Sequence, residues 1–479
     1  MLSRILKPLL LGLLVGATGL ILSFFEFTHE FEEDTGLGLL FKLRGPRPAP
    51  ADAVVVSIDK DSADQLKIPE NPDKWPRSLH ARLVEVLSKA GASVVTFDVH
   101  FIEARVEKDD KAFAAALKQA GNVVLGDALT AKEVSTFNTA GSDAPEHSIV
   151  KIIKPYAPLA ESALATVPFV LPRIPFKVNK YWTFQPSTGD APTFPVVAFQ
   201  LFNSGLYQEF LGLFEKASPN HAGMLPRDAK PIIQQKGIVK LMRDIRELFA
   251  TDPAIATRML AELERSDRAK IAESQKRRLE ILIKLYGGSN RRYVNYYGPP
   301  RTVTTLPYYR ALQIGEAASD RQAVDLKGKA VFVGLSERIL AERKDSFYTV
   351  FSQANGVFIG GVEIAATAFL NLLEDKPIKP LGTVAYLLLI PLWGLCTGMI
   401  CRVSSIIVGA ATVTGMSALY LLGAEYRFAA DGTWYPIVIP LFTQSPLAFA
   451  GAVLWNYAET NKERQQIRKA LAYYVPDEV

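Results

Sequence analysis

The stretch LGTVAYLLLIPLWGLCTGMI (381–400) is the first of three apolar runs near the end of the chain. The second run is VSSIIVGAATVTGMSALYLLG (403–423), and the third is YPIVIPLFTQSPLAFAGAVLWNY (435–457). Each contains about 20 residues, which as a helix is enough to cross the ~30 Å hydrocarbon core of a bilayer. A soluble core helix of that length would show a polar face, and these runs do not. We therefore expect three transmembrane helices between residues 381 and 457.

Another apolar run lies at the N-terminus, from about residue 8 to residue 25, after the basic residues Arg4 and Lys7. Basic residues followed by such a run are typical of membrane targeting. Small residues in the run leave a cleaved signal peptide open as one interpretation. The run continues past them to Phe25, which favours an uncleaved transmembrane anchor over residues 1–25.

The distribution of basic residues predicts how the chain is oriented, because positive charge tends to stay on the cytoplasmic side. If the chain crosses four times, one side receives Arg4, Lys7, Arg402, Lys462, Arg464, Arg468 and Lys469. Residues 26–380 and the 425–434 loop then lie on the other side. We expect a multi-pass protein of a bacterial inner (cell) membrane, with both termini cytoplasmic and the central domain periplasmic or extracellular.

Composition narrows the functional classes for this chain of 479 residues. Its formal net charge of +5 is small and dispersed, which argues against a nucleic-acid partner. The two cysteines, Cys396 and Cys401, lie in or beside the first apolar run, so the central region has no disulfide and no cysteine-based zinc site. The five histidines are scattered without metal-ligand spacing. We expect no metal and no cofactor in this chain.

Strand and helix patterns alternate after the anchor. The continuous apolar runs AVVVSI (53–58), SVVTFDV (93–99) and NVVLG (122–126) predict strands that are covered on both faces. Between the first two runs, Ser78 can cap an amphipathic helix, and acidic residues open another helix after the second run. Strand–helix–strand repeats with short connections imply an α/β domain with a mostly parallel sheet and helices on both faces.

The rest of the central region is less regular. Residues 130–195 are rich in proline, serine and threonine, and we interpret them as loops with an edge strand. Residues 205–288 carry amphipathic helical patterns and predict a helical hairpin inserted into the sheet domain. The sheet pattern resumes at YVNYY (293–297) and AVFVG (330–334), and GVEIAATAFLNLLE (361–374) predicts a buried helix leading into the membrane.

Polar residues follow the predicted strands and suggest a binding rim, because ligands bind at the carboxyl ends of strands in open α/β sheets. Asp59 follows the first strand, and Asp98 closes the second, which we expect to be its neighbour. The proposed rim for a small ligand or cation consists of Asp59, Asp98, His100, Glu103, Asp127 and Ser336, with Asp345 as a weaker candidate. The alternative is structural: Asp59 caps the following helix, and Asp98 pairs with a loop amide.

Enzyme motifs are absent from the sequence. GLSER (334–338) is not a G-x-S-x-G nucleophile elbow, because Arg338 occupies the last glycine position. The chain contains no P-loop, no G-x-G-x-x-G after a strand and no H-E-x-x-H. We therefore assign no catalytic residue.

Four segments of the central region resemble CHASE2 domains, which are extracytoplasmic sensor modules of bacterial signalling proteins. These segments are WPRSLHARLVEVLSKAGASVVTFDVHF (75–101), YVNYYGPPRTVTTLPYYRAL (293–312), LKGKAVFVGLSE (326–337) and GVEIAATAFLNLLEDKPI (361–378). The resemblance covers about 26–456 and implies one membrane helix before the sensor domain and three after it. It also implies signal transduction in response to an extracytoplasmic ligand, which the resemblance does not identify. We expect the protein to be a homodimer in the membrane lipid bilayer.

The tail KERQQIRKALAYYVPDEV (462–479) is similar to the segment that enters the catalytic domain of class III adenylate/guanylate cyclases coupled to CHASE2 sensors. The resemblance implies an output in cyclic-nucleotide biosynthesis, whose catalytic residues would lie beyond this chain. A plain amphipathic tail is the alternative. The expected domains are an anchor (1–25), a sensor (26–380), three membrane helices (381–457) and a cytoplasmic linker helix (458–479). Rival hypotheses are a sensor coupled to a histidine or Ser/Thr kinase, and a membrane-anchored extracytoplasmic enzyme.

Overall fold

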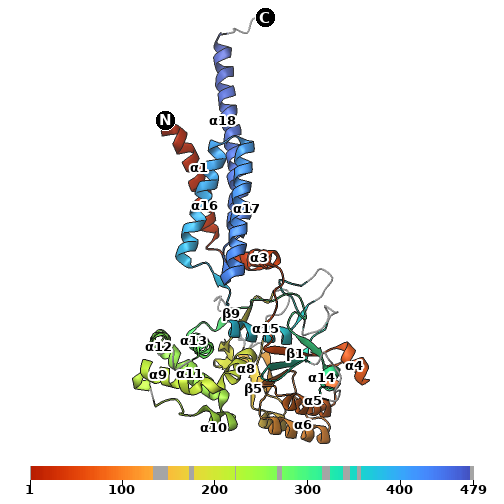
Figure 1. Cartoon of the computed structure of the whole chain (residues 1–479). Helices are drawn as coiled ribbons and strands as arrows, with labels where there is room; N and C mark the ends of the chain where they lie inside the picture. Colours follow the sequence, from red (N-terminus) through yellow and green to blue (C-terminus); the bar gives the residue numbers. More distant parts are fainter. Residues whose placement is uncertain are drawn as a thin grey trace, which may run out of the picture. The chain divides into compact units, whose positions relative to one another are not determined.

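The computed structural model divides the chain into two compact units (Figure 1). The membrane unit comprises Met1–Gly45 and Ile378–Val479, and the α/β unit comprises Pro46–Pro377. The structure describes residues 2–132, 149–171, 177–221, 223–266, 272–315, 324–337, 346–352 and 358–474.

A mostly parallel sheet forms the frame of the α/β unit, as the sequence predicts. The strands lie in the order β10-β1-β11-β2-β3-β4, with β5 beside β3. Only the pairing of β3 with β4 is antiparallel among the described strands of this sheet. The strands are β1 (Ala53–Ile58), β2 (Val94–Asp98), β3 (Val123–Lys132), β4 (Ile149–Ile153), β5 (Ala165–Pro168), β10 (Thr305–Pro307) and β11 (Ala330–Leu335).

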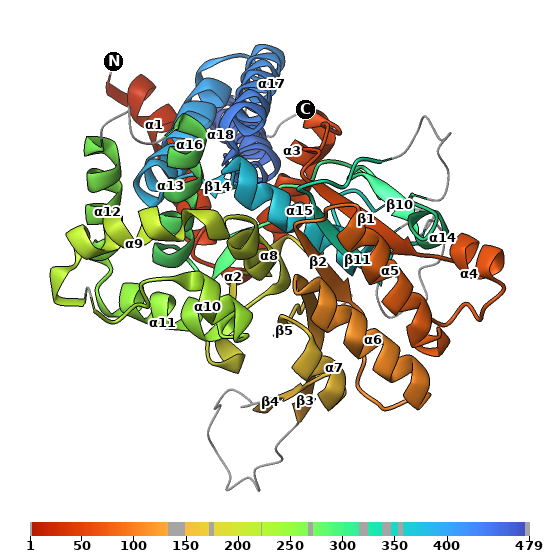
Figure 2. The same cartoon turned by 60° about the horizontal axis from the view of Figure 1, so that its bottom comes forward.

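Helices cover both faces of the sheet because alternate strand residues point to opposite faces (Figure 2). Val54 and Val56 face one helical layer, whereas Ala53 and Val55 face the other. The first layer consists of α4 (Lys60–Leu66), α5 (Arg77–Lys89), α6 (Glu107–Ala120), α7 (Ala157–Ser162) and α14 (Tyr308–Ala311). The second layer begins with α8 (Phe194–Phe202) and α15 (Gly361–Glu374), and α15 has the bounds that the sequence predicts.

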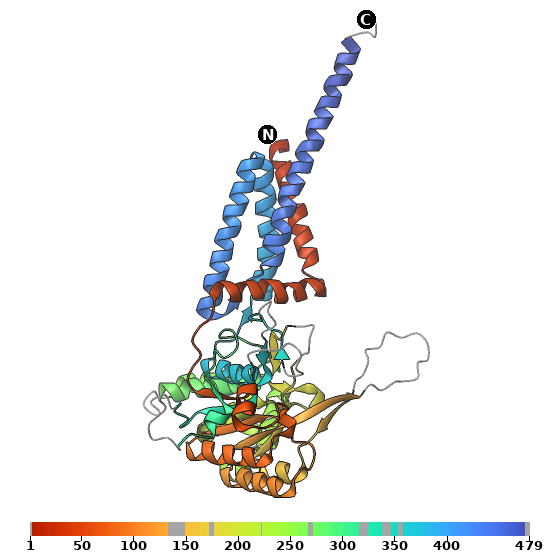
Figure 3. The same cartoon turned by 90° about the vertical axis from the view of Figure 1, so that its right-hand side faces the viewer.

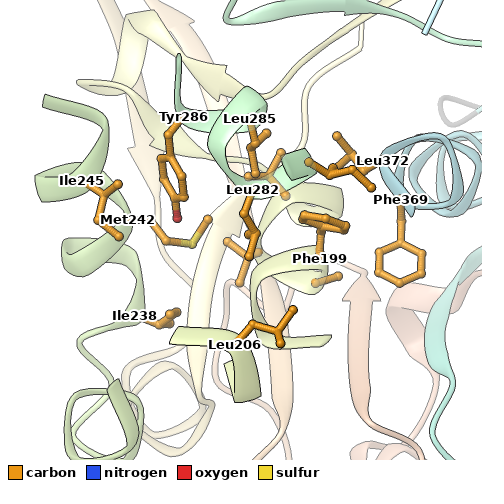
Figure 4. Packing of buried hydrophobic residues seen from close by; sticks show 14 of the residues in the cluster. Phe199, Leu206, Ile238, Met242, Ile245, Leu282, Leu285, Tyr286, Phe369 and Leu372 are labelled. Atoms are coloured by element: carbon orange, nitrogen blue, oxygen red, sulfur yellow. The ribbon is translucent and has the colours of Figure 1, made fainter. Parts of the chain in front are cut away.

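The inserted segment is larger than the predicted hairpin. Its described residues form five α-helices, α9 (Tyr207–Ala217), α10 (Ala229–Gln234), α11 (Ile238–Thr251), α12 (Ala254–Arg265) and α13 (Glu273–Gly287). Figure 4 shows Met242 and Ile245 of α11 beside Tyr286 of α13, in one cluster with Phe199 of α8 and Phe369 of α15. The insertion therefore shares the core of the second layer.

Several local predictions are wrong in detail. Helix α5 begins at Arg77 after Pro76, so Ser78 lies inside the helix and is not its cap. The 130–195 region contains β4, β5, α7, the start of α8 and short strands as well as loops. The predicted strand at 293–297 overlaps β9 only at Tyr293, and β9 pairs with β6 outside the main sheet. The remaining short strands are β6 (Lys180–Trp182), β7 (Phe184–Gln185), β8 (Ala191–Pro192), β9 (Arg291–Tyr293), β12 (Ser346–Phe347) and β13 (Ile359–Gly360).

Among its described residues, the membrane unit contains three helical segments that are long and apolar enough to cross a bilayer: Thr383–Val403, Ile406–Asp431 and Val438–Ala470. The N-terminal segment meets the same test only together with the helix that follows it, from which it is bent by 91°. The predicted N-terminal anchor therefore stays a prediction. The unit's elements are α1 (Leu2–Leu22), α2 (Glu26–Phe31), the π-helix η1 (Glu32–Gly36), α3 (Leu37–Arg44), β14 (Lys379–Pro380), α16 (Thr383–Val403), α17 (Ile406–Asp431), β15 (Thr433–Trp434), the π-helix η6 (Val438–Gln444) and α18 (Ser445–Tyr474).

Glycines allow α1 and α16 to approach closely. A Cβ atom added to Gly394 would lie 2.6 Å from the Cα of Gly16, and one added to Gly398 would lie 2.6 Å from the Cα of Gly12. Gly12 and Gly16 within α1, like Gly394 and Gly398 within α16, have the small-xxx-small spacing that lets helices pack backbone to backbone in membranes. This contact makes α1 an integral part of the membrane unit.

A charged cluster lies at one end of the same bundle. Glu459 of α18 accepts hydrogen bonds from Lys7 Nζ at 2.7 Å and from Trp455 Nε1 at 3.1 Å, and it also pairs with Arg402. Arg402 donates to Asn456 Oδ1 at 2.8 Å. These contacts join the start of α1, the end of α16 and the middle of α18. Lys7 and Arg402, two of the basic residues that predict the orientation of the chain, therefore lie at the same end of the bundle.

Candidate functional site

The parallel strands of the α/β unit end at one edge of the sheet, where the sequence places the proposed rim. Strand β11 lies between β1 and β2, so the expectation that the strands of Asp59 and Asp98 are neighbours is wrong. Two strand spacings, about 10 Å, separate β1 from β2. Ser336, which follows β11, lies between them in strand order.

Asp59 is buried and its carboxylate is fully engaged. One oxygen accepts the backbone N–H of Ser62 at 2.9 Å, which makes Asp59 the N-cap of α4. The other oxygen accepts the hydroxyl of Ser57 at 2.7 Å and the guanidinium of Arg301 at 3.0 Å. The capping alternative is therefore correct for Asp59, and an ion pair that the sequence did not predict is added to it.

Arg301 connects several parts of this edge from the loop before β10. Its guanidinium also donates to the carbonyl of Ser336 at 3.2 Å, and its backbone N–H donates to Glu363 Oε2 at 2.5 Å. Its φ of 67° is left-handed, which costs a residue with a side chain about 1–2 kcal/mol. Backbone strain of this kind persists only where surrounding contacts hold it, and it is common in ligand and switch sites.

Glu363 lies in the first turn of α15 and is only 3% exposed. It accepts the hydroxyl of Ser336 at 2.6 Å as well as the Arg301 backbone N–H. Burial raises the pKa of Glu363, and the hydrogen bonds and the Arg301 charge oppose that shift in part. We call Ser57, Asp59, Arg301, Ser336 and Glu363 the carboxyl-edge cluster.

A second polar network lies at the other end of α15. Glu374 accepts a hydrogen bond from Arg47 at 2.9 Å and one from the hydroxyl of Tyr297 at 2.8 Å. The Arg47 guanidinium also lies 4.2 Å from the centroid of the Tyr297 ring. Asn371 bonds the backbone of Asn295 twice, at 2.8 and 3.0 Å. We call Arg47, Asn295, Tyr297, Asn371 and Glu374 the exit clamp.

The exit clamp joins the two chain connections that link the α/β unit to the membrane unit. Arg47 lies just after the chain leaves the membrane unit at Gly45, and Glu374 lies shortly before it returns at Ile378. Helix α15, which has 14 residues, is about 21 Å long at 1.5 Å per residue. It therefore connects the carboxyl-edge cluster to the place where both connections are tied.

The remaining predicted rim residues do not join the cluster. Asp127 is buried on β3 and pairs with Lys154 Nζ at 2.6 Å. His100 and Glu103 are exposed. Asp98 is half-buried beside Gly334, where a Cβ atom would lie 3.0 Å from the Asp98 Cβ. Asp345 lies outside the described residues.

Sequence reasoning missed Arg301, Glu363 and the exit clamp. Arg301 and Tyr297 lie in the 293–312 segment that resembles CHASE2 domains, and Glu363 and Glu374 lie in the 361–378 segment. The resemblance to CHASE2 domains therefore marked the segments that contain these residues. Their separate positions in the chain gave no indication that a loop arginine and a helix glutamate meet at the sheet edge.

The chemistry of the carboxyl-edge cluster favours binding over catalysis. Among the described residues, no group of three or more His, Cys, Asp or Glu side chains is arranged to hold a metal ion. Arg301 is the only cation of the five, it contacts Asp59 directly, and its Nε is buried without a hydrogen bond. The ligand class suited to compete for this guanidinium is anionic.

Comparison with known proteins identifies one family. The CHASE2 domain matches residues 10–400, a range that contains the carboxyl-edge cluster, the exit clamp and most of α16. CHASE2 domains are extracellular sensory domains. No curated protein and no solved structure gives a significant match to the chain.

Proposed function

The chain belongs to the CHASE2 domain family, and we propose that it is a transmembrane signal receptor whose α/β unit senses a stimulus outside the cytoplasm. The observation that carries the proposal is the family match over residues 10–400 together with three membrane-length helices after the α/β unit. In this proposal the protein lies in a bacterial inner membrane with both termini in the cytoplasm.

The carboxyl-edge cluster is the proposed input site. An anionic ligand that binds Arg301 competes with Asp59 and changes the loop whose backbone holds Glu363. Asp98 borders this site beside Gly334, and His100, Glu103 and Asp127 remain candidates for the wider rim. This assignment is supported by Arg301, whose backbone is left-handed and which hydrogen-bonds to Asp59, Ser336 and Glu363.

Helix α15 is the proposed relay. It begins at Glu363 of the input site and ends at Glu374 of the exit clamp. A shift of α15 moves both connections to the membrane unit together, because Arg47 and Glu374 are bonded to each other. Signalling of this kind requires the ligand to favour one of two arrangements of the helix.

The proposed output is an adenylate or guanylate cyclase domain after the C-terminal segment, in a homodimer. Helix α18 is continuous to Tyr474, so a movement of the third span is transmitted along it beyond the membrane. Residues 462–479 resemble the segment that enters class III cyclase domains. Two copies of α18 side by side would let a shift of the spans change how two catalytic domains meet.

Two reporter fusions test the orientation. Alkaline phosphatase fused after Lys379 is expected to be active, because it requires export, and a reporter that works only in the cytoplasm is expected to be active after Tyr474. If both junctions lie on the same side of the membrane, the receptor proposal is overturned.

Grafting a class III cyclase domain after Tyr474 tests the relay. We expect Arg301→Gly to change cyclic-nucleotide production, whereas Lys118→Ala on the exposed face of α6 leaves it unchanged. Equal production by the parent, Arg301→Gly and Lys118→Ala at equal expression would exclude the carboxyl-edge cluster as the input site.

A further inference from the structure

The segment after α1 is a helix that runs crosswise to it. Elements α2, η1 and α3 follow one another without a break over Glu26–Arg44, and their axis is bent by 91° from that of Leu6–Leu22. Figure 3 shows this crosswise helix in red at the foot of the helical bundle of the membrane unit. The sequence assigns residues 26–44 to the exported domain, whereas the structure groups them with the membrane unit.

One side of the crosswise helix is fastened to the membrane unit. The buried carboxylate of Glu32 accepts the backbone N–H groups of Ile437 and Val438, each at 2.7 Å, and the Trp434 Nε1–H at 3.3 Å. Farther along, the ring of Phe41 meets the ring of Phe428 edge to face, with centroids 5.1 Å apart. The helix is therefore held at the level where η6 begins the third span.

Phenylalanines are exposed on a different face of the helix and in the turn before it. Phe24, Phe25, Phe27 and Phe31 are 74%, 55%, 70% and 45% exposed. The Phe27 and Phe31 rings stack with centroids 6.4 Å apart. A contiguous apolar patch of this kind marks an interaction surface, because exposed apolar area is unfavourable in water.

The position and charge of the exposed phenylalanines indicate that their partner is the apolar part of the bilayer. The patch follows directly in the chain after α1, where Leu13, Leu14 and Ile21 are more than half exposed. At 3.6 residues per turn, His29 lies on the side of the helix opposite Phe27 and Phe31. The Phe24–Arg44 segment has five acidic residues against two basic ones, Lys42 and Arg44, so apolar burial and not attraction to anionic lipid is its driving force.

We propose that the crosswise helix, Glu26–Arg44, is an interfacial helix that lies in the plane of the bilayer, with the four phenylalanines in the acyl region of the adjacent leaflet. The inference rests on the bundle crossing the membrane and is independent of ligand and output. Such helices bury one apolar face at the boundary between head groups and acyl chains. Because Glu32 holds the start of η6, the interfacial helix also sets the depth of the third span.

Site-directed fluorescence in vesicles tests this placement. The full chain, with Cys396→Ala and Cys401→Ala, carries one new cysteine for a bimane label, either by Phe27→Cys or by the matched control His29→Cys on the opposite side. The labelled proteins are reconstituted in phosphatidylcholine vesicles and quenched with acyl-brominated lipid or with aqueous iodide.

We expect the label at position 27 to be quenched several-fold more by brominated lipid than the label at position 29, with the reverse order for iodide. Partial replacement of phosphatidylcholine by phosphatidylglycerol is expected to leave this pattern unchanged. Equal iodide quenching at both positions would place the phenylalanines in water and overturn the proposal. Protection of position 27 from both quenchers would show that protein covers the face, and would overturn it as well. The reporter fusions are unaffected by either outcome, so the receptor proposal is tested separately.

Discussion

The two ends of α15 hold a glutamate in different ways. At its start, Glu363 is 3% exposed, and Arg301 binds two buried carboxylates, Asp59 through its guanidinium and Glu363 through its backbone N–H. At its end, the Glu374 side chain is 22% exposed and pairs one to one with Arg47. Losing a partner at the start of α15 costs more stability than losing one at its end, because a buried carboxylate without its partner is strongly destabilising.

The backbone follows the same division. Arg301 has a left-handed φ of 67°, whereas Arg47 is not among the described residues with positive φ. Arg47 also stacks on Tyr297, which spreads the contact over an aromatic ring. The proposed relay uses this difference: a ligand changes the carboxyl-edge cluster, and the exit clamp transmits the change without breaking.

The largest expected effect is that of Arg301→Ala. Removing the guanidinium leaves Asp59 and Glu363 buried without their cation, which destabilises the α/β unit by about 3 kcal/mol. Arg301→Gly is the matched variant, because glycine relieves the left-handed backbone and recovers about 1 kcal/mol. Pulse proteolysis of the full chain in detergent across urea concentrations measures both. A smaller loss for Arg301→Ala than for Arg47→Ala would reverse the comparison of the two ends.

The pH dependence of stability sharpens the comparison at Glu363. Burial raises its folded-state pKa, so between its unfolded value and the raised value the folded protein binds more protons. Its contribution to stability therefore falls as pH rises through that window. Glu363→Gln cannot titrate, and the stability difference, variant minus wild type, is expected to increase with pH above about 4.5.

His80 also titrates in this pH range, so the effect of Glu363 has to be measured as a difference between the variant and wild type. Burial lowers the pKa of His80 to about 3, so the unfolded chain binds the extra proton between pH 3 and about 6.5. His80 therefore makes the unit more stable as pH rises, which is the opposite sign from Glu363. The His80 contribution is common to wild type and Glu363→Gln and cancels in the difference. A flat difference from pH 4 to pH 8 would contradict the assigned role of Glu363.

The exit clamp is expected to give a smaller energy. A double-mutant cycle of Arg47→Ala and Glu374→Ala should yield a coupling of about 1 kcal/mol, because both side chains are about one-fifth exposed. Arg47→Lys keeps the charge but loses stacking on Tyr297, and should retain only part of the coupling. Urea unfolding followed by pulse proteolysis measures the cycle. A coupling as large as the Arg301→Ala loss would make the two ends equivalent.

Local patterns predicted those parts of the fold that depend on local chemistry. AVVVSI (53–58) is a buried strand because its continuous β-branched residues suit a sheet covered on both faces. The apolar residues of 361–374 likewise predicted α15, and the final apolar runs predicted three membrane-length helices.

Strand order and long-range contacts could not be predicted in this way. Nothing in AVFVGL (330–335) indicates that β11 lies between β1 and β2, because the local sequence of a strand does not specify its neighbours in the sheet. The helix-capping role of Asp59 could be predicted from its position directly after a strand. Its ion pair with Arg301 could not be predicted from that position. Arg301 is 242 positions away in the chain and reaches Asp59 only in the folded sheet.

The smallest expected effects are those of His100→Ala and Glu103→Ala. Both residues are exposed, and such substitutions usually change stability by less than about 0.5 kcal/mol. Their value lies in separating the rim from the carboxyl-edge cluster, because a contact to ligand can be lost without a loss of stability. In the cyclase graft, a changed response with unchanged urea unfolding would place them in the ligand site. An unchanged response would confine the input site to the residues around Arg301, since those lie where the strained loop, β11 and α15 meet.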